Sequence, residues 1–123
     1  MATGQKTWVI PGGRIPLLSS GIEPANTSRD ELCILNTNES DASIQLVIYY
    51  EHQPPVGPYV ISVQAQRMRV IRFNDLVDPA PILLDMNYAV VINSDIPIVV
   101  QFTRVDSSSG SPATTITMAY PNK

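Results

Sequence analysis

The segment SIQLVIYYEHQPPVGPYVISVQA, residues 43–65, decides the fold. Every second side chain from Ile44 to Tyr50 is aliphatic or aromatic, so these side chains share one face of an extended strand. The same alternation returns in YVISVQA, residues 59–65. Between the two runs lies EHQPPVGP, residues 51–58, whose Pro-Pro and Gly-Pro steps force a turn. The segment therefore predicts a β-hairpin with one buried face.

The next segment, RMRVIRF at residues 67–73, continues with strand character. Its two first arginines face away from Met68 and Val70, but the alternation breaks where Ile71 takes the arginine face. A β-bulge at this point would re-aim Arg72, and bulges are frequent at sheet edges and beside functional loops. We therefore expect a bulge at Ile71 and Arg72.

Other segments rich in β-branched residues surround this centre. YAVVIN and PIVVQFTRV, residues 88–93 and 97–105, predict two strands joined by a turn at Ser94-Asp95. Three more strands are expected in TWVI, ELCILN and TTITMAY, which are residues 7–10, 31–36 and 114–120. The long connection between the first two of these is expected to contain a short strand at residues 15–18.

The length and composition agree with an all-β chain. Eleven prolines and six glycines are scattered so evenly that almost no window remains for a helix. Eight or nine short strands in 123 residues predict an antiparallel β-sandwich or jelly roll, formed by a single domain over residues 1–123.

The charge content points to self-association. Charged residues are 15% of the chain, against about 25% in an average soluble protein. So few charges on a small chain suggest that another copy covers part of the surface, and we expect a homo-oligomer. The N-terminal residues lack a signal-peptide core, and no run of apolar residues is long enough to span a membrane. The sequence therefore predicts a soluble, cytoplasmic protein.

The residues needed for catalysis are scarce. His52 is the only histidine and lies in a proline-rich turn, where a solvated side chain is the common outcome. Cys33 is the only cysteine, and its apolar neighbours predict a buried structural thiol. A structural zinc site from one chain is excluded by this ligand count, and no phosphate-binding glycine motif is present. We predict no enzyme activity, no cofactor and no metal centre.

The stretch RFNDLVDPAP, residues 72–81, concentrates polar groups between two buried segments. Asn74 and Asp75 suit a turn in which they bond to nearby backbone amides, and Asp78 before proline suits the start of another turn. The carboxylates do not have the spacing of an EF-hand calcium loop. A structural loop and a polar binding site are both compatible with these residues.

Two kinds of binding surface are compatible with the rest of the chain. Arg67, Arg69, Arg72 and Arg104 would give a basic patch for DNA, although a pI near 4.9 favours pairing of each arginine with a carboxylate. The aromatic side chains would suit a sugar, but Tyr50 and Tyr59 share faces with aliphatic residues and are expected to be core.

Several strings are specific enough to indicate a family. They are CILN (33–36), IYY (48–50), PVGPY (55–59), RFNDLVDPAPI (72–82), PIVVQFTRVDS (97–107) and MAY (118–120). The chain resembles the sensory rhodopsin transducer family from about Trp8 to Tyr120. The resemblance implies a jelly-roll β-sandwich assembled as a homotetramer, with a signalling or binding role and no catalysis. It also implies possible partners: a membrane photoreceptor, DNA or a carbohydrate.

The resemblance also marks candidate residues for a ligand, a partner or a subunit interface. The motif positions that match the family are Arg72, Asn74, Asp75, Asp78, Arg104 and Asp106. Two departures from the family pattern are the apolar Phe102 and the serine-rich segment 107–110. One hypothesis is that Arg72 pairs with Asp75, Asp78 or Asp106 and pins the loop, because the guanidinium fork holds carboxylates in fixed geometry.

Three functions follow, in order of preference. The first is a non-enzymatic signalling module that acts through protein contacts as a homotetramer. The second is a carbohydrate-binding module for a small sugar. The third is a DNA-binding regulator that uses a basic patch of Arg67, Arg69 and Arg104.

Overall fold

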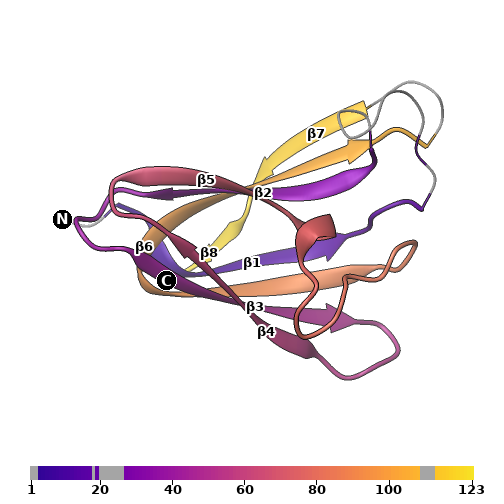
Figure 1. The fold of residues 1–123 in the computed structure, drawn as a ribbon, viewed down its shortest axis with the longest axis horizontal. Helices are drawn as coiled ribbons and strands as arrows, with labels where there is room; N and C mark the ends of the chain where they lie inside the picture. The colour runs from indigo at the N-terminus through magenta and orange to yellow at the C-terminus, as the bar shows by residue number, and fades with distance from the viewer. Residues whose placement is uncertain (1–2, 18, 20–26, 109–112) are drawn as a thin grey trace.

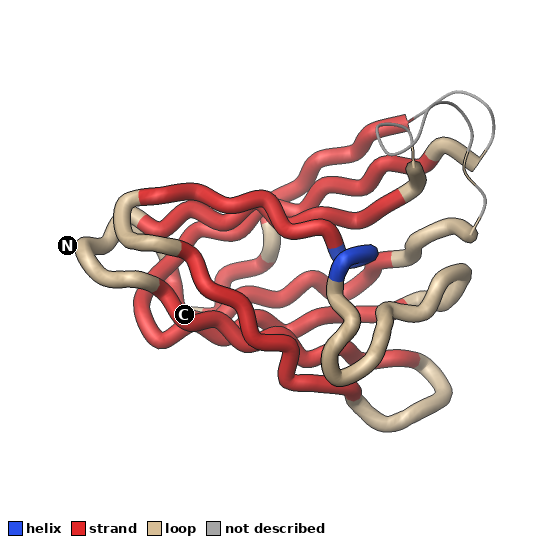
Figure 2. Tube along the Cα trace, viewed as in Figure 1, coloured by secondary structure: helices blue, strands red, loops and turns tan. Residues whose placement is uncertain are grey.

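The computed structural model describes residues 3–17, 19, 27–108 and 113–123, and antiparallel β-strands make up most of this part of the chain. Figure 2 shows the strands with one short helical turn among them. The strands lie in two layers that face each other (Figure 1). Eight strands are present in the described residues, so the predicted antiparallel β-sandwich is confirmed.

Among the described residues, the lower layer in Figure 1 contains five strands. In spatial order they are β4 (Val56–Val63), β3 (Ala42–Tyr50), β6 (Tyr88–Asp106), β1 (Gln5–Gly13) and β8 (Tyr120–Asn122). β1 and β8 therefore lie side by side, although they come from opposite ends of the sequence. This layer contributes one half of the apolar core.

The upper layer shares β6 with the lower one. β5 (Arg67–Arg72) pairs with β2 (Arg29–Asn36), β2 pairs with β6, and β6 pairs with β7 (Ala113–Met118). A single 3₁₀ turn, η1 (Phe73–Asp75), follows β5 directly. β6 is therefore the only strand of the described chain that belongs to both layers.

β6 passes from one layer to the other at a bend. Its first part pairs with β1 and β3, and its second part pairs with β2 and β7. Thr7 lies opposite Asn93 while Gln5 lies opposite Ile98, so extra residues of β6 bulge out at the bend. Strands that change sheets do so through such bulges or bends. The ribbon in Figure 1 shows β6 turning over at the end of the sandwich near the N-terminus.

The expectation of two separate strands joined by a turn at Ser94-Asp95 is wrong. Both residues belong to the continuous strand β6, and Ser94 still pairs with Ile44 of β3. The side chain of Asp95 accepts a hydrogen bond of 2.8 Å from the backbone N–H of Ser43, which ties the bend to the neighbouring strand. The polar residues at the bend therefore shape the strand without ending it.

The predicted hairpin is confirmed as β3 and β4. Ile44 lies opposite Ile61, and the inward-facing side chains of both strands are buried. Tyr59 is in the core as expected, and its hydroxyl donates to the carbonyl of Ala80 at 2.5 Å. Tyr50 is half-buried and packs against the core.

Two local expectations from the sequence are wrong. β5 pairs with β2 in unbroken register from Arg67 opposite Asn36 to Arg72 opposite Glu31, so no bulge lies at Ile71 and Arg72. Arg67, Arg69 and Ile71 all lie on the same face of β5, so the alternation is in fact unbroken. Because β5 is an edge strand, this face is exposed at the two arginines and becomes buried only at Ile71.

The described residues after β1 form no strand at 15–17, and residue 18 lies outside the described part. The backbone N–H of Asp85 instead donates to the carbonyl of Ile15 at 2.8 Å.

Cys33 is also not where it was expected. It lies between Leu32 and Ile34, which are fully buried, and is itself only half-buried. Because side chains alternate along a strand, the two neighbours that point into the core leave Cys33 on the outer surface of the upper layer.

A buried asparagine joins three segments at the end of the sandwich where β6 bends. The side-chain NH₂ group of Asn36 donates hydrogen bonds to the carbonyl of Ser40 at 2.9 Å and to the carbonyl of Val63 at 3.1 Å. Its side-chain oxygen accepts from the backbone N–H of Asn38 at 3.0 Å, and Asn38 in turn donates to the carbonyl of Pro97 at 2.7 Å. Asn36 is fully buried, so these bonds replace its contacts with water.

We predict that Asn36→Ala lowers the free energy of unfolding by about 2–4 kcal/mol, because it leaves buried carbonyl groups without donors. Asn93→Ala, at an exposed position of β6, is the matched control and is expected to change stability by less than about 1 kcal/mol. Urea denaturation followed by circular dichroism measures both values. Equal losses in the two variants would contradict the assigned role of Asn36.

Candidate functional site

A buried carboxylate joins the two layers at the end opposite the β6 bend. Asp30, near the start of β2, accepts a hydrogen bond of 2.5 Å from the hydroxyl of Tyr88. It also accepts one of 3.3 Å from Nε of Arg104, with which it forms an ion pair. Tyr88 begins β6 and Arg104 lies near its other end, so the bend of β6 brings both residues to the same carboxylate.

Two neighbouring residues, Gly13 and Phe73, pack against the Tyr88 ring of the Asp30 cluster. Gly13 lies against the ring of Tyr88, and a Cβ atom at that position would come within 2.5 Å of Cζ. The ring of Phe73 also packs against Tyr88, with its centroid 5.5 Å from that of Tyr88. A larger residue than glycine would therefore displace the tyrosine from Asp30.

The environment changes the acidity of both hydrogen-bonded groups. Burial raises the pKa of Asp30, and the hydrogen bonds from Tyr88 and Arg104 offset this only in part. Burial, followed by the charge of the neighbouring Asp30, raises the pKa of the Tyr88 hydroxyl. Tyr88 is therefore a permanent hydrogen-bond donor to Asp30.

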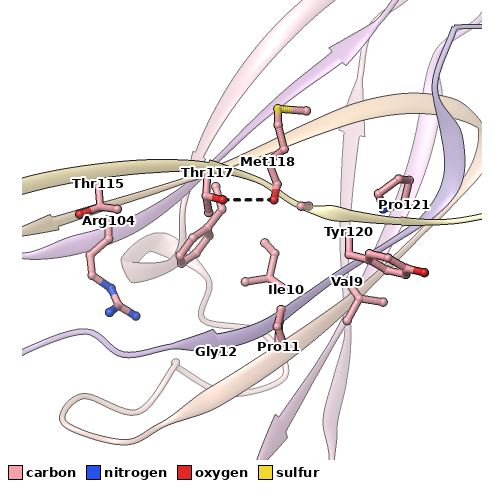
Figure 3. A pocket seen from close by; sticks show the side chains of 12 residues that line it. Val9, Ile10, Pro11, Gly12, Arg104, Thr115, Thr117, Met118, Tyr120 and Pro121 are labelled. Carbon is pink, nitrogen blue, oxygen red and sulfur yellow. Dashed lines mark hydrogen bonds between the residues drawn. The ribbon is translucent and has the colours of Figure 1, made fainter.

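Two cavities meet at Arg104. The first, of about 590 Å³, is mostly apolar and lies between β1 on one side and the β7–β8 segment on the other (Figure 3). The second, of about 640 Å³, is lined by more polar side chains, including Tyr49, Glu51 and Asn87. Arg14 donates to the side-chain oxygen of Asn87 at 3.5 Å, and Asn87 donates to Glu51 at 3.2 Å. Both cavities can accept a small molecule in size.

The loop after β5 is held by contacts of a structural kind. Phe73 is fully buried and contacts Phe102 as well as Tyr88. Asn74 donates from its side chain to the carbonyl of Ser28 at 3.1 Å, which ties η1 to the residue before β2. Asp75 and Asp78 are exposed.

The ion pairs differ from the hypothesis based on the motif. Within residues 3–17, 19, 27–108 and 113–123, ion pairs join Arg29 to Glu31 and Arg104 to Asp30. Neither of these involves the carboxylates of Asp75, Asp78 or Asp106. Arg72 is half-buried and lies opposite Glu31 in the β2–β5 pair. The pairing of Arg72 with one of the three loop carboxylates is therefore not found.

Asp106 has a local role at the end of β6. The hydroxyl and the backbone N–H of Ser108 donate to its carboxylate at 2.6 and 2.9 Å. These two bonds lower the pKa of Asp106. Such a motif organises the chain where it leaves the strand.

The structure divides the arginines of the expected basic patch, because Arg104 lies apart from Arg67 and Arg69. Arg67 is opposite Asn36 at the end of β2, whereas Arg104 is opposite Asp30 at its start. Six residues along a strand separate these ends by about 20 Å. Arg69 donates to the carbonyl of Ser62 at 2.7 Å, and Arg67 donates to that of Gln66 at 3.0 Å. Arg67 and Arg69 are neighbours, and Arg104 belongs to the Asp30 cluster.

Metal-binding groups do not gather in the part of the chain that the structure describes, where no three His, Cys, Asp or Glu side chains lie together. His52 is exposed in the loop between β3 and β4. None of the described segments forms a helix of the length and apolar character needed to cross a membrane.

Asp30 and Tyr88 were not among the candidates from the sequence. A usable signal exists in RDELCILN, where Asp30 has the same parity as Leu32 and Ile34 and must therefore point into the core. A carboxylate on the buried face of a strand needs a partner, and that requirement singles out Asp30. The identity of the partners could not be read in the same way, because Tyr88 and Arg104 lie far along the chain.

The raised pKa of Asp30 predicts a specific pH dependence of stability. Above its ordinary value of 3.8 and below the raised value, the folded protein keeps a proton on Asp30 that the unfolded chain has lost. Protonated Asp30 therefore adds to the free energy of unfolding when the pH is below its ordinary pKa. This contribution is lost as the pH rises through the raised pKa of the folded state. Asp30→Asn stays neutral, so the unfolding free energy of the wild type minus that of the variant is expected to fall as the pH rises from 3.8 through the raised pKa of Asp30.

Urea denaturation at a series of pH values measures this difference. Tyr88→Phe provides a second variant, in which the loss of a hydrogen bond to the carboxylate moves the fall to higher pH. A difference that rises with pH would mean that pairing with Arg104 outweighs burial.

Comparisons of the sequence and the fold with known proteins identify the family of this chain. The family model described as Anabaena sensory rhodopsin transducer matches residues 3–121. The solved structure of the Anabaena sensory rhodopsin transducer is 45% identical, with a TM-score of 0.75 over 84% of this chain and 100% of that one. The crystal structure of Thermotoga maritima 1070 is 27% identical, with a TM-score of 0.74 over 97% of this chain and 96% of that one. Among curated proteins, none matches. The chain belongs to the sensory rhodopsin transducer family.

Proposed function

We propose that this protein is a non-enzymatic signalling module of the cytoplasm that assembles as a homotetramer and relays a signal through protein contacts. Its partner is a membrane photoreceptor of the sensory rhodopsin type or another signalling protein. Membership of the transducer family supports the relay function. The single observation that supports assembly is an apolar surface on the outside of the upper layer.

This surface, which we call the outer apolar face, runs across the upper layer, and its large exposed side chains come from β5, β2 and β7. Cross-strand register places Leu35 beside Met68, and Cys33 beside Val70. On the far side of β6, β7 adds two more large side chains to the same face. The outer apolar face consists of Cys33, Leu35, Met68, Val70, Ile116 and Met118.

The outer apolar face suits a second copy of the chain. Met68 and Met118 are 56% and 54% exposed, and with Cys33 and Leu35 they line a shallow hollow of about 220 Å³. Contiguous apolar surface of this kind marks sites of protein contact. Methionine adapts its shape to a partner, which favours a packed interface. The low charge of the whole chain agrees with burial of such a surface between copies.

We infer that the loop 72–78 supports the fold and does not bind the partner. Buried Phe73 and the bond from Asn74 to Ser28 support this assignment. The exposed carboxylates of Asp75 and Asp78 then contribute to the polar surface beside the loop.

We predict that Leu35→Glu combined with Met68→Glu lowers the mass of the assembly, because it places charges where two copies meet. Val60→Glu is the matched control, since Val60 is 65% exposed on β4 of the other layer. Size-exclusion chromatography with light scattering gives the masses, and circular dichroism checks that each variant is folded. A monomeric wild type at micromolar concentration would contradict the proposed assembly.

The same three proteins then test the relay function. Wild type and Val60→Glu are expected to bind a detergent-solubilised sensory rhodopsin, with affinities that differ between light and dark. Isothermal titration calorimetry under both conditions measures the affinities. Equal affinities in light and dark, or no binding in either, would exclude this photoreceptor relay.

A second candidate function, binding of a small sugar, is favoured by the polar cavity beside Arg104. Tyr49 is partly exposed there, and Glu51, Asn87 and Arg14 are linked by hydrogen bonds at the same place. Sugar-binding sites commonly combine an aromatic ring, on which the sugar packs, with planar polar side chains that hydrogen-bond to its hydroxyl groups.

For this second function, we predict that one sugar in a panel of mono- and oligosaccharides raises the melting temperature. A ligand at 100 times its Kd stabilises the folded state by about 2.7 kcal/mol. Asn87→Ala is expected to abolish the shift, whereas Asn93→Ala, which lies outside the cavity, leaves it unchanged. An unchanged melting temperature across the panel would rule out this function for the sugars tested.

A further inference from the structure

The apolar cavity at Arg104 has walls from three parts of the chain. Val9 and Ile10 of β1 line one side, and Thr117 and Met118 of β7 line the other, while Pro121 of β8, the strand that pairs with β1, lies at one end (Figure 3). The ring of Phe102 from β6 also lines the space. The volume of about 590 Å³ lies within the range of cavities that bind small organic ligands.

One end of this cavity is cationic. Figure 3 shows the side chain of Arg104 at one end of the row of apolar residues and Tyr120 at the other. Arg104 is 36% exposed, and within the described residues it makes one hydrogen bond, from Nε to Asp30. Its two terminal NH₂ groups have no protein partner there and remain able to donate. Thr115 lies close to this end and adds a hydroxyl group.

The guanidinium group is held in place before any ligand arrives. Asp30 is fully buried and is itself fixed by the 2.5 Å hydrogen bond from Tyr88. A cation fixed in this way loses little side-chain entropy when it binds an anion. The planar fork of arginine also matches the two oxygens of a carboxylate.

We propose that this cavity binds a small amphipathic carboxylate, with its apolar body between β1 and the β7–β8 segment and its carboxylate on Arg104. The charge complementarity selects the class of ligand: an apolar chain or ring that carries one negative charge. A single charge suits the end of the cavity, because Asp30 already neutralises part of the charge of Arg104. This binding site adjoins the polar cavity, with which it shares Pro11, Gly12 and Arg104, and it touches the outer apolar face at Met118.

Gly12 allows a direct test of the location. It lines the apolar cavity and the edge of the polar cavity, and a Cβ atom built on it would meet no other atom within 4 Å. Larger side chains can therefore be placed at this position without a clash at Cβ. Gly12→Ala and Gly12→Leu form a graded series that fills the cavity and leaves the Asp30 cluster in place.

The experiment is isothermal titration calorimetry with decanoate, below the concentrations at which it forms micelles, and with 1-decanol as the neutral analogue. The wild type is expected to bind decanoate at least roughly tenfold more tightly than decanol, because a charge-assisted hydrogen bond contributes about that ratio. Gly12→Leu is expected to abolish the binding of both compounds, and Gly12→Ala to weaken it.

A second pair of variants tests the cationic end. Arg104→Met is expected to lose the preference for decanoate over decanol, whereas Arg67→Met, an arginine outside the cavity, keeps it. Asn87→Ala is expected to leave decanoate binding unchanged, because Asn87 lines only the polar cavity. Circular dichroism confirms that each variant is folded, and Gly12→Leu remains informative if Arg104→Met is not.

Three outcomes would overturn the proposal. The first is equal or undetectable binding of decanoate and decanol to the wild type. The second is full decanoate binding by Gly12→Leu, which would place the ligand elsewhere. The third is a change in assembly mass for Gly12→Leu when the wild type does not bind decanoate, which would mean that a second copy of the chain fills the cavity.

Discussion

The fold depends on the passage of β6 through both layers. This strand pairs with four others, and its bend turns one hydrogen-bonded ladder into two facing sheets. The bend also returns the second end of the strand to the first, so that Tyr88 and Arg104 meet at Asp30. A polar network at each end of the sandwich then fixes the geometry: Asn36 holds the bend, and Asp30 holds the open end.

The alternation of side chains was sufficient to predict most of the fold. The hairpin of β3 and β4 and the buried face of Ile44 followed directly from period-two patterning. The same pattern carried no information on where hydrogen bonding stops. Ser94 and Asp95 have the composition of a turn, but Ser94 pairs with Ile44 of β3 and the side chain of Asp95 accepts a hydrogen bond from the backbone N–H of Ser43, so the strand continues through them. Cys33 was predicted to be buried because its neighbours in the sequence are apolar. Its position between buried Leu32 and Ile34 in an alternating strand puts its side chain on the outer face instead.

The candidate site was predictable only in part, for a related reason. The motif around Arg72 stands out in the sequence, but its most buried member is Phe73, an ordinary core residue between Tyr88 and Phe102. The carboxylate that joins the two layers is Asp30, whose partners come from the two ends of a distant strand. Local patterning identifies which face a residue occupies, and it cannot identify what will lie opposite across the sandwich.

The position of β1 has a consequence for biosynthesis. Its partners are β6 and β8, so β1 pairs with residues that are translated much later. Contacts of such long sequence separation form late and slow the folding of β-proteins. Until then the apolar side chains of Trp8 and Ile10 are without their final neighbours. β1 therefore lacks its sheet partners until β6 has been translated, and unpaired apolar strands of this kind are prone to aggregate.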